Sequence, residues 1–263
     1  MSFLQHLEEL RWHIIKSVVA IIAMAILAFI FKDIIFDQIL LAPKNPDFFT
    51  NRMFAIFADK MNSDVLRIND KPFELINITM AGQFSTHIWI SVISGIILAF
   101  PYIVYEFWKF FSPALYDKER RYARYAVLAI SFLFFIGVLF GYYVIVPLSI
   151  HFLGSYQISA TVQNTINLPS YFSTIASVTL AAGIVFELPV VVFFLSKIGI
   201  VTPQFLRTYR KHAIIVILIL SAIITPPDIF SQILVTIPLV ILYEVSIHIS
   251  AAIQRNKEKE LAS

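Results

Sequence analysis

The sequence predicts an all-α membrane protein with six transmembrane helices and both termini in the cytoplasm. Apolar residues make up 59% of the 263 positions and charged residues only 14%, a balance typical of chains that fold in lipid. Several stretches without a formal charge are long enough to cross a bilayer, and Lys and Arg gather in alternate connections between them. The chain has no Cys, which excludes disulfides, thiolate metal sites and cysteine nucleophiles.

The first two spans are predicted at residues 14–36 and 82–105. The centre of the first carries no charge, and the Lys16 side chain can snorkel towards the headgroups, which lengthens the apolar stretch. Residues 75–105 also lack a formal charge, and Pro101 is expected to bend the end of the second span.

The third and fourth spans are predicted at residues 125–150 and 171–195. From Tyr125 to Phe186 the chain has 62 positions without a formal charge, which is too many for a single crossing. The polar stretch GSYQISATVQNTINLPS, residues 154–170, divides them into two spans.

The last two spans are predicted at residues 212–226 and 229–247. The stretches without a formal charge here, 212–227 and 229–243, contain only sixteen and fifteen residues. Each therefore reaches at most ~24 Å, whereas the hydrocarbon layer is ~30 Å thick, so we expect local thinning of the bilayer or shelter from the other helices. A buried helical hairpin is the alternative, and the lack of a polar stripe favours two spans.

Positive charge orients the spans. Fourteen of the twenty Lys and Arg residues lie at the two ends of the chain or in two connections on the same side. The other six all lie in residues 32–74, so both termini are predicted to be cytoplasmic. The 32–74 segment also contains Pro43, Pro46 and aromatic-rich patches, which predict a structured cap. Without an internal repeat, residues 1–263 are predicted to form a single polytopic membrane domain.

The sequence contains no catalytic or cofactor-binding motif. HExxH, GxSxG, the P-loop and GxGxxG are all absent, and the six His residues are scattered along the chain. We therefore predict no enzymatic activity, no metal site and no cofactor. Nucleic-acid-binding motifs are also absent, so the net charge of +3 is attributed to membrane topology.

Glu187 stands in AGIVFELPVVVFFL, residues 182–195, where ten of the fourteen residues are large and apolar. An ionised carboxyl at mid-helix costs ~3 kcal/mol, which ten apolar neighbours offset at roughly −0.3 to −0.6 kcal/mol each. Pro189 lacks an amide hydrogen and frees the Val185 carbonyl, so the pattern predicts a polar notch in a kinked helix. Two roles stay open for the carboxyl: a protonated group that joins a neighbouring helix through a hydrogen bond, or a functional polar site.

The stretch HLEELR, residues 6–11, lies just before the first span. Glu8 and Arg11 are spaced i, i+3, and Glu9 and His13 are spaced i, i+4. A solvated helix start with local ion pairs therefore explains the pattern by itself.

A second charged stretch, SPALYDKERRYARY, occupies residues 112–125. Ser112 can cap a helix that begins at Pro113, and anchoring of the cytoplasmic side explains the basic residues. Taken with HLEELR, however, this stretch places Glu9 and Glu119 at the same membrane face. If the two carboxylates converge, their best-matched ligand is a pair of adjacent arginines, because a guanidinium presents planar paired donors to a carboxylate.

Five stretches of the sequence resemble the hallmark stretches of the TatC family, the multispanning receptor subunit of the twin-arginine protein translocase. They occur in the same order as in the family and span nearly the whole chain. They are HLEELR (6–11), AP (42–43), FWKFFSPALYDKERR (107–121), FELPV (186–190) and TPPDIFSQ (225–232).

The resemblance implies six helices in a curved, cup-like shell with both termini cytoplasmic. It implies a non-enzymatic role as receptor for twin-arginine signal peptides and core of a translocase, driven by the proton-motive force, that exports folded proteins across the inner membrane. The implied partners are those signal peptides, single-span subunits of the TatA and TatB type, and further copies within a larger receptor complex.

The resemblance also assigns site residues. The positions that match the signal-peptide site are Glu9, Glu119, Arg11, Phe110 and Arg121. Glu187 matches the intramembrane glutamate of the concave face, where the family meets polar residues of its single-span partners, and Gln232 is expected to contribute to the same contact. Pro43 and Asp228, like Gln232, match positions linked to activity.

Three features depart from the family pattern. His13 stands where the family usually has a basic residue, so a contact from this position is expected to depend on pH near neutrality. Glu106 stands where Gln is common and adds a third acid beside the proposed arginine site. The segment 44–80 is longer than expected and matches nothing in the family.

A proton- or ion-coupled small-solute transporter that uses Glu187 as its carrier site is the main alternative. Such transporters commonly have repeated halves with interrupted helices at matching positions. The sequence shows one broken helix without a counterpart, which favours the translocase.

Overall fold

The structure is a computed structural model that describes residues 3–62, 67–69, 73–111, 123–159, 161, 164–225 and 229–262. Helices make up most of these residues, and the strands within the described ranges are only two residues long. The predicted all-α membrane fold is confirmed.

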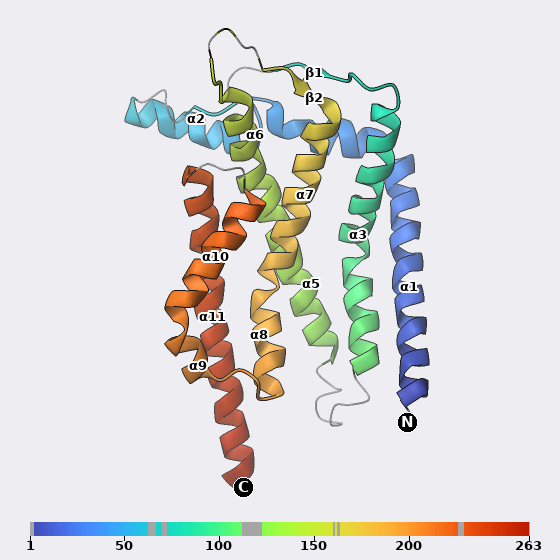
Figure 1. The fold of residues 1–263 in the computed structure, drawn as a ribbon, viewed down its shortest axis with the longest axis vertical. Coiled ribbons are helices and arrows are strands. Elements are labelled where there is room, and N and C mark those ends of the chain that lie inside the picture. The colour runs from blue at the N-terminus through green and yellow to red at the C-terminus, as the bar shows by residue number, and fades with distance from the viewer. Residues whose placement is uncertain are drawn as a thin grey trace.

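Long helices run side by side along the longest axis of the molecule (Figure 1). A π-helical turn, η5 (Gly141–Ile145), joins two of them into one continuous rod, and α9 (Pro203–Thr208) is a short helix at the start of α10. The rods are, in chain order, α1 (Phe3–Ile30), α3 (Gly82–Phe111), α5 (Ala123–Phe140) with α6 (Val146–Ser155), α7 (Leu168–Phe186) with α8 (Leu188–Lys197), α10 (Arg210–Ile224) and α11 (Ile229–Ala262).

Five helical stretches of the described chain are long and apolar enough to cross a membrane. They are Leu7–Ile30, Gly82–Phe110, Ala126–Ser155, Leu168–Lys197 and Ser231–Arg255. The counterpart of the predicted fifth span, α10, has only 15 residues, so the number of six crossings stays a prediction. One side of α10 is open, because Ile215, Ile219 and Ile223 are exposed, which does not favour a hairpin enclosed by the bundle.

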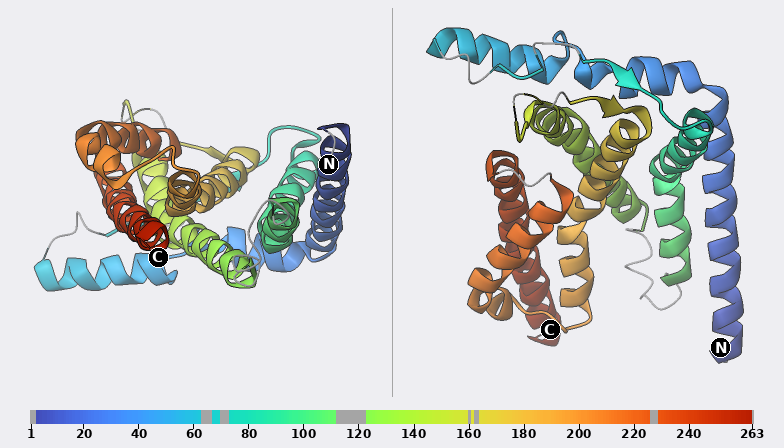
Figure 2. Two further views of the ribbon diagram at one scale, coloured as in Figure 1. Left: turned by 90° about the horizontal axis from the view of Figure 1, so that it is seen from below. Right: turned by 45° about the horizontal axis from the view of Figure 1, so that its top comes forward.

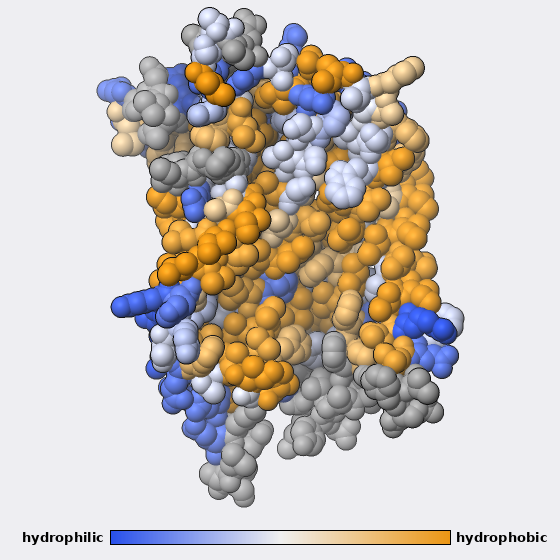
Figure 3. Space-filling view, in the orientation of Figure 1, coloured by the Kyte–Doolittle hydropathy of each residue, from blue (hydrophilic) through white to orange (hydrophobic). Residues whose placement is uncertain are grey.

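The surface of the bundle is apolar where the surface of a soluble protein is polar. Large apolar side chains are exposed along α1, among them Val19, Ile22, Ile26 and Ile30. On the face drawn in Figure 3, a broad hydrophobic belt covers the middle of the molecule, and hydrophilic residues gather towards its two ends. A belt of this kind is the surface that lipid covers.

Three helix pairs dominate the packing: α1 with α3, α5 with α7, and α8 with α11. Glycine allows the first approach, since a Cβ added at Gly95 of α3 would lie 2.8 Å from the backbone nitrogen of Ala25 in α1. Seen along the spans, the pairs form a curved row with α1 and α3 at one end and α10 and α11 at the other (Figure 2). The buried core follows α7, which lies near the middle of this row.

The two ends of the bundle differ. The beginning of α1 and the end of α11 lie at the same end, which we call the terminal end (Figure 1). The connection between α1 and α3 covers the opposite end, which we call the cap end. It contains η1 (Ile34–Leu40), η2 (Ala42–Lys44), α2 (Phe49–Met61) and β1 (Leu75–Ile76).

Buried amides hold the cap on the bundle. The Asn51 side chain donates to the carbonyls of Pro43 and Asn45 at 2.9 and 2.8 Å. The Asn69 side chain donates to Asn51 Oδ1 at 3.2 Å and to the carbonyl of Pro147 in α6 at 3.0 Å. The prediction of a structured cap is therefore confirmed for its described residues.

A short parallel pairing adds to this attachment. β1 pairs with β2 (Ile166–Asn167), which directly precedes α7. It joins the cap to the connection between α6 and α7.

Candidate functional site

The first turns of α1 carry the acids and bases of HLEELR at the terminal end. Arg11 and Glu8 are ion-paired at 3.5 Å, as their spacing predicts, and the Arg11 guanidinium also lies 6.0 Å from the centre of the Trp12 ring. Glu9 is half-buried and makes no ion pair within the ranges that the structure describes. The carboxylate of Glu9 is therefore the one left available on this turn.

His13 does not pair with Glu9, and the predicted local pair is wrong. Its Nδ1 instead lies 2.6 Å from Oε2 of Glu106 in α3, and both side chains are buried. The contact across two helices excludes water, so it outcompetes an exposed i, i+4 pair on one helix. Tyr102, one turn before Glu106, also lies within reach of this carboxyl.

Phe110, next to the last residue of α3, touches the same histidine. Its ring centre lies 6.0 Å from that of His13 in an edge-on arrangement, and only 7% of the residue is exposed. Phe110 therefore packs the end of α3 onto α1, and the Glu106 carboxyl belongs to this internal contact. Three other predicted site residues, Glu119, Arg121 and Asp228, lie outside the described residues.

Glu187 lies at the break between α7 and α8. Its backbone has φ −74° and ψ −1°, and the helix resumes with Pro189 in its first turn. The predicted interruption is confirmed. Both carboxyl oxygens are buried, and the described chain offers neither of them a hydrogen bond. The Phe134 backbone of α5 lies close by but outside hydrogen-bonding geometry.

This arrangement bears on the two roles left open for Glu187. A carboxyl that joined neighbouring helices would show a hydrogen bond to one of them, and the part of the chain that is described provides none. An unpaired buried carboxyl is costly, so the geometry favours a group that bonds to something from outside this chain.

Pro43 and Gln232 lie away from the acids of the terminal end. Pro43 is fully buried in η2 at the cap end, where its carbonyl accepts the bond from Asn51. Gln232 donates to the Leu218 carbonyl at 3.2 Å and so connects α11 with α10. Neither contact was predicted.

Gln232 and Glu187 lie at different depths. α8 and α11 run in the same direction, and Ser196 lies opposite Ser250, where their hydroxyls are 2.8 Å apart. Counting back along both helices at ~1.5 Å per residue places Gln232 about 13 Å closer to the cap end than Glu187.

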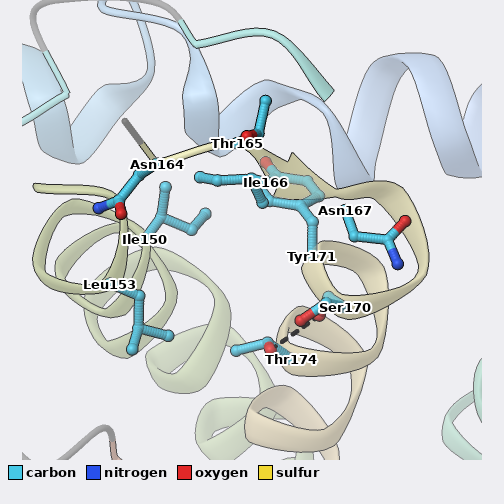
Figure 4. Close-up of a pocket in the computed structure, with 9 residues that line it drawn as sticks. All are labelled: Ile150, Leu153, Asn164, Thr165, Ile166, Asn167, Ser170, Tyr171 and Thr174. Carbon is cyan, nitrogen blue, oxygen red and sulfur yellow. Dashed lines mark hydrogen bonds between the residues drawn. The ribbon is translucent and has the colours of Figure 1, made fainter. Parts of the chain in front are cut away.

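A pocket at the cap end does not fit the predicted ligand. It has a volume of about 510 Å³ and lies between α6 and α7 (Figure 4). Its lining contains amides, hydroxyls and apolar groups but no carboxylate, so it cannot pair with guanidinium groups. The nine lining residues are Ile150, Leu153, Asn164, Thr165, Ile166, Asn167, Ser170, Tyr171 and Thr174.

Comparison with known proteins decides the family. The family described as "TatC: Sec-independent protein translocase protein (TatC)" matches residues 5–238. The chain belongs to the TatC family. The small-solute transporter alternative gains no support from this match.

Similar proteins match over nearly their whole length. The Sec-independent protein translocase protein TatC of Blattabacterium sp. subsp. Periplaneta americana (strain BPLAN) is 44% identical over 261 residues, which cover 98% of this chain and 97% of that protein. TatCy of Bacillus subtilis (strain 168) is 32% identical and covers 100% of this chain and 94% of that protein.

Solved structures of the family have the same fold. The crystal structure of the twin-arginine translocase receptor TatC superposes with a TM-score of 0.71 at 32% identity, covering 95% of this chain and 99% of that one. The same receptor in DDM gives a TM-score of 0.72, with coverage of 93% and 99%.

Proposed function

We propose that this protein is the receptor and core subunit of a Sec-independent translocase that exports folded proteins carrying twin-arginine signal peptides. The observation that supports this most directly is the available carboxylate of Glu9. Its neighbours Glu8 and Arg11 neutralise each other, whereas Glu9 has no ion pair within the described chain. A half-buried acid without a counter-charge attracts a cationic ligand.

In the proposed complex, the two arginines of the signal peptide dock on Glu9 and Glu119. A guanidinium forms two parallel hydrogen bonds with a carboxylate, which a lysine ammonium cannot reproduce, so the site selects arginine over lysine. Arg11 and Arg121 flank the site. Phe110 supports the site from the next turn of α1, because its contact with His13 fixes the end of α3 against the helix that carries Glu9.

The orientation belongs to the same proposal. Six crossings, with the terminal end in the cytoplasm, place the acidic site on the side where signal peptides are made, in the cytoplasmic (inner) membrane. The Lys and Arg distribution supports this orientation. The apolar part of the signal peptide then lies along the concave side of the curved row.

Glu187 is the proposed contact for single-span subunits of the TatA and TatB type. In the proposed contact the Glu187 carboxyl, whose buried oxygens have no hydrogen bond in the described chain, turns outward to a polar group of a partner helix. Gln232 lies about 13 Å closer to the cap end. Pro43 and Asp228 are proposed to be required for activity, Pro43 through the cap. The protein has no catalytic step of its own, and the proton-motive force drives transport in a complex with several copies of this chain.

Crosslinking of a signal peptide tests the docking. A photoreactive peptide with RR at its motif is expected to crosslink to the wild type more strongly than a KK peptide, and Glu9→Ala and Glu119→Ala are expected to abolish the difference. Glu8→Ala is the matched control, since Glu8 is already paired, and it should keep the preference for RR. An unchanged preference in both test variants would refute the proposal.

A further inference from the structure

The helix α2 of the cap lies across the spans and not along them. In both Figure 1 and Figure 2 its far end extends beyond the edge of the bundle. Its first turn is attached to the third rod, because the Thr50 hydroxyl donates to the Tyr143 carbonyl and the Phe48 ring stacks on Tyr143 with 5.5 Å between centres.

The attachment point lies within an apolar span. Tyr143 belongs to the stretch Ala126–Ser155, and twelve residues separate it from the end of that stretch at Ser155. At ~1.5 Å per residue this distance is roughly 18 Å along the helix. α2 therefore starts beside the membrane-facing part of the bundle and not in the water beyond it.

The side chains of α2 fall into three sectors around its axis. At about 100° per residue, the sectors are centred roughly 120° apart. The sector that faces the bundle is buried and contains Thr50, Asn51 and Ala58. The charged sector contains Arg52 and Asp59, and Asp59 pairs with Arg67 at 2.6 Å.

The third sector is apolar and uncovered. Its five large side chains are between 40% and 68% exposed. They are Phe49, Met53, Ile56, Phe57 and Met61. A helix that touches protein on one side and presents a charged side and an apolar side elsewhere fits the corner where protein, water and lipid meet.

We propose that α2 is a membrane anchor whose apolar sector inserts at the boundary between headgroups and acyl chains of the leaflet at the cap end. Lys60 lies within this sector, where its aliphatic stem can follow the apolar surface while its ammonium reaches a phosphate. The anchor fixes the height of the cap over the bundle and gives a role to part of the segment 44–80. It does not depend on the proposed docking site.

A lipid surface fits this face better than a protein does. The part of α2 that extends beyond the bundle has no helix of the described residues below it in the two views of Figure 2. The third rod, to which α2 is attached, exposes the large side chains of Phe132, Leu139 and Tyr143. The space beside such an apolar flank is filled by lipid in a membrane.

The absence of Cys from the chain allows a clean test. Single cysteines at Phe57 and Arg52 place a nitroxide spin label in the apolar and charged sectors. Both native side chains are exposed, so the replacements leave the bundle intact. The purified full chain is reconstituted in vesicles of phosphatidylethanolamine and phosphatidylglycerol, and each label's accessibility to oxygen and to a water-soluble nickel complex is measured.

The label at 57 is expected to favour oxygen and the label at 52 to favour nickel, so the sign of the depth parameter reverses between them. A second variant, Met53→Asp with Phe57→Asp, should shift a label at Met61 towards nickel while a label at Ile22 in α1 keeps its oxygen preference. Equal nickel access at 57 and 52 would show that the face is in water. Shielding of the label at 57 from both reagents would show that a second copy covers it. Either result overturns the proposal.

Discussion

Glu106 and Glu187 are both acids in the apolar helices of one bundle, but their surroundings are opposite. Glu106 is 3% exposed, and its carboxyl lies 2.6 Å from Nδ1 of His13. Glu187 has two buried oxygens without a hydrogen bond in the described chain. Burial of a carboxyl is unfavourable at both positions, and only Glu106 offsets that free energy with a hydrogen bond inside the described protein.

The contrast separates two uses of a buried acid. A pair such as Glu106 and His13 fixes the register of two helices. Here it holds α1 on α3 one helical turn after Glu9. An acid left unpaired weakens its own fold, so Glu187 is expected to gain its hydrogen bond from the proposed partner helix. Variants of both acids and of the packing between α1 and α3 test this distinction, and their expected effects on stability fall from about 3 kcal/mol to below about 1 kcal/mol.

Removal of Glu106 from its buried pair with His13 should have the largest effect on stability. We expect Glu106→Ala to lower the free energy of unfolding by about 3 kcal/mol, because it leaves the His13 ring buried without its partner. Denaturant unfolding in detergent measures the change. Glu8→Ala, at the exposed ion pair of α1, is the control and should change stability very little.

The double replacement His13→Leu with Glu106→Leu sharpens this test. It removes both polar groups together and should recover most of the lost stability. If the double variant is as unstable as the sum of its single variants, the two side chains do not act as a pair.

The packing of α1 against α3 should also be rigid further along the two helices. A Cβ at Gly95 would lie 2.8 Å from backbone atoms of Ala25 and Ile21, which cannot move aside, so Gly95→Ala should cost about 1–3 kcal/mol. At Gly154 the nearest atom is 3.6 Å away, and Gly154→Ala should be neutral or slightly stabilising. Thermal unfolding of the two variants compares them, and an equal response would show that α1 and α3 are loosely joined.

Replacement of Glu187, the acid without a hydrogen bond in the described chain, should change the free energy of unfolding in the opposite direction. Glu187→Leu removes an unpaired buried carboxyl, so we expect the free energy of unfolding to rise by about 1–2 kcal/mol. Transport should stop, while signal-peptide crosslinking stays normal. Lower stability with normal transport would make Glu187 an internal contact like Glu106 and remove the contrast.

The smallest effect is expected for Glu106→Gln. The amide keeps the shape of the side chain and an oxygen that can accept from His13, so the loss of stability should stay below about 1 kcal/mol. A loss as large as that of Glu106→Ala would show that the charge of the carboxylate, and not the hydrogen bond, holds the two helices.

Sequence reasoning succeeded where the determinant was local. Stretches without charge predicted the helices, the Glu187 and Pro189 neighbours predicted a break, and the spacing of Glu8 and Arg11 predicted their ion pair. It failed for His13, because a partner 93 residues away replaced the local one.

The cap shows the same limit. Pro43, Pro46 and the aromatic residues predicted that residues 32–74 are structured, since Pro restricts the backbone and aromatic residues are scarce in slack connections. The bonds of Asn69 to Asn51 and Pro147 depend on how α6 lies against the cap, which no local pattern records. The apolar sector of α2 became visible only when the bundle identified which of its faces is buried.

Whether Glu9 and Glu119 form one docking site depends first on the distance between their side chains. In this cysteine-free chain, Glu9→Cys with Glu119→Cys can be treated with a short bismaleimide in membranes, with Glu9→Cys and Met61→Cys at opposite ends as the negative control. We expect an efficient intramolecular crosslink between positions 9 and 119 and none in the control. Failure of the first pair to crosslink, while both cysteines react singly with maleimide, would show that the two positions do not share one docking site.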